Sequence, residues 1–162
     1  PAQAIDVLAE VVRLRESSLG PNSPQVLTAL VTQSQAETAA GRQADAQRSV
    51  DRALAIAQAN PALPPALRVN VLRAKSDALL AAGRWQEATD WLAQGEDIAT
   101  ALAESDLRRL ALSGSRARWL MASGDRPAGV QLLDQTIAQL RIQLPDDHPL
   151  LQPLLQALAG AR

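Results

Sequence analysis

The chain has 162 residues, a formal net charge of −1 and no cysteine. This charge excludes a general attraction to nucleic acid or anionic membranes, and the lack of cysteine excludes disulfides, thiolate metal sites and a cysteine nucleophile. Apolar residues make up 47% of the chain, mostly Ala and Leu, with neither Phe nor Tyr. This composition favours closely packed helices over sheets.

The sequence also gives indications about the context in which the chain works. No uninterrupted apolar run approaches the ~18 residues of a membrane span, so we expect no membrane insertion by this segment. The chain opens with Pro1 and lacks a signal-like segment, so we expect a piece of a longer protein. The lack of cysteine suits the cytoplasm or the periplasm, with the cytoplasm slightly favoured. Arg outnumbers Lys fifteen to one, which we interpret as the composition of a high-GC bacterial genome.

Taken in chain order, apolar residues at helical spacing predict eight helices. In the third predicted helix, one face consists of Ala46, Val50, Ala53 and Leu54. The residues 42 positions earlier show the same apolar pattern in the first predicted helix. The predicted helices cover about 3–18, 24–40, 43–58, 65–82, 85–103, 106–123, 126–143 and 148–159.

An internal repeat of about 42 residues organises these helices. The stretch AAGRQADAQ at 39–47 returns as AAGRWQEAT at 81–89 and as ASGDRPAGV at 122–130. The repeat places Gly41, Gly83 and Gly124 at one kind of turn, where glycine tolerates the left-handed conformation that ends a helix.

A second kind of turn contains proline. LGPNSPQVL at 19–27 resembles LPDDHPLLQ at 144–152, and Pro24 and Pro149 lie 125 residues apart, close to three times 42. Both prolines suit the first position of a helix, and Ser23 and Ser105 are suitable N-caps.

The predicted fold is all-α, a single solenoid of antiparallel helix pairs over residues 1–162. The unit is a helix, a glycine turn, a helix and a proline turn. The chain divides into a half repeat at 1–20, repeats at about 24–60, 65–103 and 106–143, and a terminal half repeat at 147–160.

These motifs resemble the tetratricopeptide repeat (TPR), and the 42-residue length resembles its kinesin-light-chain subtype. The inner turn appears as Gly41-Arg42-Gln43-Ala44-Asp45-Ala46 and as Gly83-Arg84-Trp85-Gln86-Glu87-Ala88. The small residue where paired helices cross falls at Ala46, Ala88 and Gly129, and its counterpart on the first helix at Ser34, Ser76 and Ala117. The sequence departs from the family pattern at two positions. At the inner turn, only Trp85 keeps the usual aromatic residue, and Gln43 and Arg126 replace it in the other two repeats. Glu37 occupies a position where Tyr is usual.

The resemblance implies a right-handed superhelix whose first-of-pair helices line a concave groove. Positions that recur at +42 and +41 would then face this groove in three rows. The rows are Gln35, Asp77 and Arg118; Val31, Arg73 and Gly114; and Thr38, Leu80 and Met121. Such a groove suits an extended peptide or a helix.

Several of these residues also have a plain structural interpretation. Asp77 and Arg118 either pair with each other across adjacent helices or contact a ligand. His148 beside Asp146 and Asp147 suits turn chemistry better than a metal site. A basic run on one predicted helix either is a solvated face or docks an acidic partner; it consists of Arg108, Arg109, Arg116 and Arg118. We expect the tryptophans at helix contacts, namely Trp85, Trp91 and Trp119. Lys75 has no visible desolvating or cationic neighbourhood.

No arrangement of catalytic groups is visible, so we expect neither an enzyme nor a bound cofactor or metal. We expect a scaffold that binds a peptide or protein in the groove, as the regulatory or adaptor part of a larger protein. The alternative is a sensor domain of a bacterial signalling protein, such as a Ser/Thr kinase, that acts by self-association or by binding a small ligand. Possible partners are therefore a protein or peptide, flanking domains, or a second copy.

Overall fold

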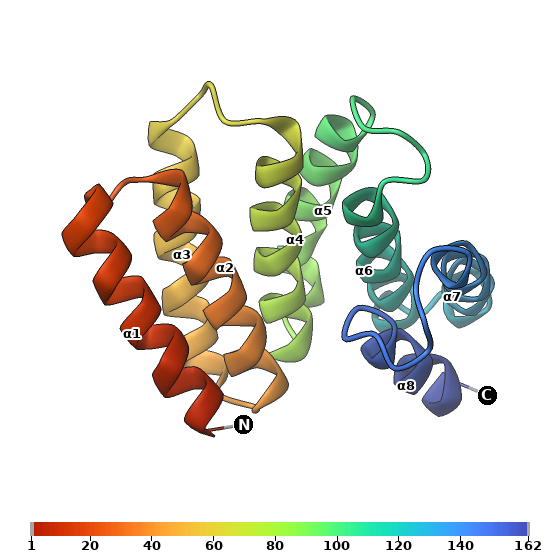
Figure 1. Cartoon of the computed structure of the whole chain (residues 1–162). Coiled ribbons are helices and arrows are strands. Elements are labelled where there is room, and N and C mark those ends of the chain that lie inside the picture. The colour runs from red at the N-terminus through yellow and green to blue at the C-terminus, as the bar shows by residue number, and fades with distance from the viewer. Residues whose placement is uncertain (1, 162) are drawn as a thin grey trace.

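Figure 1 shows the computed structural model of the chain, which describes residues 2–161. The described residues form eight helices and contain no strand. α2, α4 and α6 stand in one row, and α3, α5 and α7 each pack against the row as the partner of the preceding helix. The helices are α1 Ala2–Leu19, α2 Pro24–Ala39, α3 Gln43–Ala59, α4 Pro65–Ala81, α5 Trp85–Ala99, α6 Leu107–Ser123, α7 Arg126–Arg141 and α8 Gln152–Ala161.

The glycine turns form as the repeat predicts. Gly41 has a φ of 72° and Gly83 a φ of 74°, so both inner turns use the left-handed conformation that favours glycine. At the other kind of turn, Pro24 is the first residue of α2, and the Ser23 hydroxyl accepts a hydrogen bond from the Val26 amide at 3.3 Å. The predicted cap at Ser23 is therefore confirmed.

Two predicted helix starts are wrong. Asp106, not Ser105, caps α6, because its carboxylate accepts from the Arg108 amide at 2.8 Å. α8 begins at Gln152 and not near 148, so Pro149 lies in the preceding turn and not at the first helical position. The amides of Leu151 and Gln152 instead donate to the His148 carbonyl. α5 also stops at Ala99, four residues before its predicted end.

Paired helices cross at small residues, as the repeat predicts. Ala46 and Ala88 are fully buried, and the Ser34 hydroxyl donates to the Ala46 carbonyl at 2.9 Å across the first crossing. In the third pair, a Cβ added to Gly129 would lie 2.7 Å from the Ala117 carbonyl oxygen. The crossing is therefore too close for any side chain there, and the helices pack backbone to backbone.

The core runs along the solenoid in three clusters. The first cluster joins α1 to α4 and includes Val26, Leu27 and Val50; the second joins α4 to α6 through Val69, Leu92 and Leu112. The third cluster joins α6, α7 and α8 around buried leucines at 133, 140, 151 and 154. Because each helix pair buries its apolar surface against its neighbours, the repeats stabilise one another.

The substitution Ala88→Leu tests the crossing. Three added carbons have no space at a fully buried position, so we expect a loss of about 1–3 kcal/mol in the free energy of unfolding. Chemical denaturation followed by circular dichroism measures it. Ala93→Leu on the exposed face of the same helix is the matched control, and equal stability of the two variants would contradict the crossing.

Candidate binding pocket on the concave face

A pocket of about 680 Å³ lies along the row of first-of-pair helices. Three helices supply its wall, and the segment 148–156 closes one side. The lining residues include small and apolar side chains that leave space, together with polar and charged ones. They are Thr32, Gln35, Ala36, Thr38 and Ala39 of α2; Arg73, Ala74 and Asp77 of α4; Ala111, Ser115 and Arg118 of α6; and His148, Pro149, Leu150, Pro153, Leu154 and Gln156.

Asp77 is the centre of a charged cluster in this pocket. One carboxylate oxygen accepts from Arg73 Nη1 at 3.0 Å, one turn earlier on the same helix. The other oxygen accepts from Arg118 Nη2 and, at 2.6 Å, from the Ser115 hydroxyl, both on α6. The predicted pairing of Asp77 with Arg118 therefore exists, and it joins two successive repeats.

The cluster contains more positive than negative charge. Arg73 and Asp77 each expose 13% of their side chains, and Arg118 exposes 27%. Two guanidinium groups therefore share one carboxylate, which leaves one surplus positive charge in a partly dehydrated position. The Nε atoms of both arginines are buried without a hydrogen-bond partner, an arrangement that costs free energy. A further acceptor near these groups would lower that cost.

The structure brings five of the eight predicted groove residues into this pocket: Gln35, Thr38, Arg73, Asp77 and Arg118. The other three, Val31, Leu80 and Met121, are not among its lining residues. Val31 is only 6% exposed and packs in the first core cluster, while Met121 packs in the third core cluster and beside Gly129. Both side chains point into helix contacts, where burial of apolar surface is favourable.

The third residue of the Val31 row, Gly114, is covered by α8. A Cβ added to Gly114 would lie 2.7 Å from a methyl group of Leu154. The contribution of residues 148–156 to the pocket was missed from the sequence. The only available signal was the pair Pro149 and Pro153, which lie on either side of the start of α8.

His148 belongs to the turn chemistry of this segment. Its Nδ1 accepts from the Leu150 amide at 3.1 Å, and its carbonyl accepts from Leu151 and Gln152. The interpretation of His148 as part of the turn chemistry is confirmed. Among residues 2–161, no group of three or more His, Cys, Asp or Glu side chains is placed to hold a metal ion. No helix in the same range is long and apolar enough to cross a membrane.

The tryptophans lie at helix contacts, as predicted. Trp85 and Trp119 meet edge to face at 6.2 Å between ring centroids, and Trp119 Nε1 donates to the Trp85 carbonyl at 3.0 Å. Lys75 is buried, contrary to the expectation from sequence. Its amine pairs with Asp51 at 2.5 Å and lies 5.9 Å from the Trp91 ring centroid.

The basic run on α6 does not form one patch. Arg108 pairs with its neighbour Asp106, while Arg109 donates to the Leu102 carbonyl at 3.0 Å. Arg116 pairs with Glu96 and lies over the Trp119 ring, and the hydrogen bonds that it donates to the Glu96 carboxylate raise the pKa of Arg116. Only Arg118 faces the concave pocket, so the four side chains act at separate places.

The described residues form three helix pairs, each joined by a glycine turn and crossing at small residues, with one further helix at each end, and this arrangement defines a TPR-like solenoid. The family model for the tetratricopeptide repeat matches residues 1–59, which confirms the resemblance seen in the sequence motifs. The TPR fold generally mediates protein–protein interaction and is typically a non-catalytic scaffold.

Two solved structures are similar over almost the whole chain. Both are TPR-like repeats of a protein of Podosopora anserina described as a kinesin light chain, one of them a point variant. The variant has a TM-score of 0.67 and 27% identity, and the other structure 0.67 and 26%. Each match covers 99% of this chain and 76% of the other. The comparison with curated proteins gives no match.

The charged cluster makes a prediction about stability. Asp77→Ala leaves Arg73 and Arg118 partly buried without their shared carboxylate, so we expect a loss of about 1–3 kcal/mol in the free energy of unfolding. Glu87→Ala, which removes a solvent-exposed pair with Arg84, is the control and should leave the free energy of unfolding nearly unchanged. Denaturant titration of both variants measures the change in the free energy of unfolding. Equal changes in the two variants would contradict a stabilising role of the charged cluster.

Proposed function

We propose that the concave pocket binds a segment of a partner protein that carries an acidic group. The observation that supports this proposal is the surplus charge of Arg73 and Arg118 around Asp77. A carboxylate from an Asp or Glu side chain, or from a chain terminus, would supply the missing acceptor. Arginine suits this role because its planar group binds carboxylates through two parallel hydrogen bonds.

The rest of the pocket suits a peptide in an extended or helical form. Ala36, Ala39, Ala74 and Ala111 make a floor of small apolar side chains, and Leu150 and Leu154 add larger ones on the opposite side. Gln35 and Thr38 offer side-chain donors and acceptors at one end. Apolar anchors of the peptide would provide affinity, and the acidic group would determine its register.

The chain would then act as the regulatory or adaptor part of a larger protein, without catalysis of its own. Its single histidine has Nδ1 engaged by the Leu150 amide, and the chain has no cysteine. The serines near the pocket serve the structure: Ser115 donates to Asp77 and Ser76 to the Leu72 carbonyl. These side chains bind and position, and none forms a nucleophile with an adjacent base.

A selection from a library of random peptides, half of them with amidated C-termini, tests the proposal. We expect the bound peptides to be enriched in acidic side chains or in free C-termini. Arg118→Gln should weaken their binding about tenfold or more, since a hydrogen bond to a charged group is worth about 1.5–3 kcal/mol. Fluorescence polarisation measures the dissociation constants.

Arg116→Gln is the matched control, because Arg116 lies on the same helix but pairs with Glu96 outside the pocket. Its binding should equal that of the parent chain, and circular dichroism checks that both variants are folded. Peptides without acidic enrichment, or equal binding by the two variants, would contradict a carboxylate-binding pocket.

A further inference from the structure

Asp77 is a negative charge inside a pocket that would bind negative groups. Its carboxylate accepts from Arg73 Nη1 at 3.0 Å, from the Ser115 hydroxyl at 2.6 Å and from Arg118 Nη2. The two arginines that would receive an acidic group of a partner therefore already share one carboxylate. Asp77 offsets part of their charge and repels any second anion that approaches them.

The charges that line the concave pocket leave a balance of one positive charge. Two of its lining residues are the cations Arg73 and Arg118, and one is the anion Asp77. His148 also lines the pocket, but its Nδ1 accepts a hydrogen bond from the Leu150 amide, which only a ring nitrogen without a proton can do. The imidazole is therefore neutral in this arrangement. One bound negative charge would make the pocket electrically neutral.

We propose that Asp77 determines the charge of the group that the pocket accepts, so that a singly charged carboxylate binds in preference to a doubly charged phosphate. This role of Asp77 rests on the proposed function, because it concerns the same pocket. A carboxylate carries one negative charge, whereas a phosphorylated side chain carries about −1.5 to −2 at pH 7. The attraction to the pocket grows in proportion to this charge, but the cost of removing the charge from water grows with its square.

The cost of dehydration is large at this position. Arg73 and Asp77 each expose only 13% of their side chains. A carboxylate bound there would find its counter-charge in the surplus guanidinium group, while the second charge of a phosphate would have none. Without Asp77, the two arginines would balance both charges. The pocket would therefore recognise a permanently acidic side chain of a partner and not a phosphorylated one.

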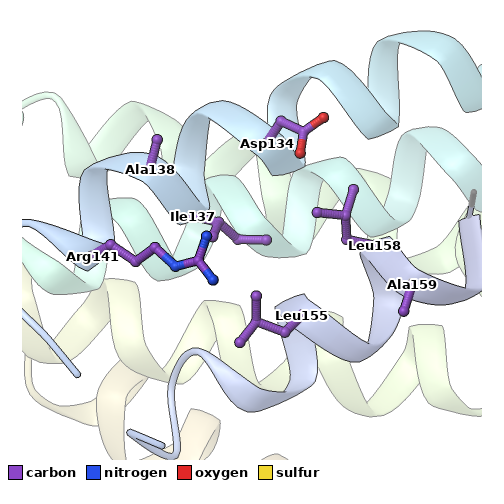
Figure 2. Close-up of a pocket in the computed structure, with 7 residues that line it drawn as sticks. All are labelled: Asp134, Ile137, Ala138, Arg141, Leu155, Leu158 and Ala159. Carbon is purple, nitrogen blue, oxygen red and sulfur yellow. The ribbon is translucent and has the colours of Figure 1, made fainter. Parts of the chain in front are cut away.

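A second groove provides a comparison within the same chain. Figure 2 shows it between α7 and α8, with a volume of about 490 Å³. The charges that line it, Asp134 and Arg141, are balanced. Arg141 pairs with Asp146 and exposes half of its side chain, so its charge is solvated. Arg141 therefore serves as a control for an arginine that lacks the dehydrated surroundings of the concave pocket.

Four sets of peptides with blocked termini test the selection by charge. They share random flanks without Asp and Glu, and carry Glu, Gln, phosphoserine or the methyl ester of phosphoserine at the centre. The methyl ester keeps the phosphate group but only one negative charge, so it separates charge from shape. The immobilised parent chain captures peptides at about pH 7.5, where phosphoserine is mostly doubly charged. Fluorescence polarisation then gives the dissociation constants of the enriched sequences with each central residue.

We expect the parent chain to bind the Glu peptide and the methyl ester at least about tenfold more tightly than the phosphoserine peptide. Asp77→Asn keeps the shape of the side chain and removes its charge. It should strengthen the binding of phosphoserine about tenfold more than that of Glu, because the lost repulsion acts on two ligand charges and not on one. The preference for the carboxylate should then disappear or reverse.

Two variants outside the pocket are the controls, and circular dichroism checks that all variants are folded. Glu96→Gln removes a carboxylate that pairs with Arg116, and Arg141→Gln removes the solvated arginine of the second groove. Both should keep the order of binding seen with the parent chain. That order tests the proposal on the parent chain alone, even if Asp77→Asn does not fold.

Three results would overturn the role of Asp77. They are equal binding of Glu and phosphoserine by the parent chain, an unchanged preference in folded Asp77→Asn, and a methyl ester that binds as weakly as phosphoserine, which would indicate selection by shape. Equal binding of all four peptides, Gln included, would instead contradict the proposed function itself, and with it the selection by charge.

Discussion

The close crossing of paired helices is the constraint on which this solenoid depends. Ser34 donates a hydrogen bond to the Ala46 carbonyl at the first crossing, and at the third crossing Ala117 and Gly129 bring the backbones so near that no larger side chain fits at Gly129. The crossing recurs with the 42-residue period, and each pair therefore packs on the next in the same way. The three core clusters follow from this stacking, because every helix pair exposes apolar surface that only its neighbours cover.

The concave pocket and its charges are consequences of the same stacking. Arg73 reaches Asp77 because the two are four residues apart on one helix, whereas Arg118 reaches it only because α6 follows α4 in the row. A repeat that places equivalent positions side by side thus converts charges 41 residues apart into one cluster. Glu37 shows the same effect inside a pair: this buried carboxylate accepts from Gln33 on its own helix and from Ser49 on the next.

Local patterns were sufficient to predict most helices and the inner turns. Gly41 and Gly83 mark turns because glycine, which has no Cβ, adopts a positive φ without strain, and Ser23 caps α2 by accepting a hydrogen bond from an amide three residues away. The groove was predicted less well. Gln35 faces the pocket, but Val31, one turn earlier on α2, packs into the core, and the difference depends on the angle at which neighbouring helices cross.

The sequence by itself determined the all-α class, the repeat, the helix pairs and the small residues at their crossings, since each depends on spacing along one chain. The tertiary structure decided which charges meet and which residues close the pocket. Residues 148–156 reach the concave face because α8 begins late, three residues after Pro149, and its Leu154 covers Gly114. Such contacts depend on the three-dimensional path of a turn, and burial of apolar surface selects that path only when all the helices are in place.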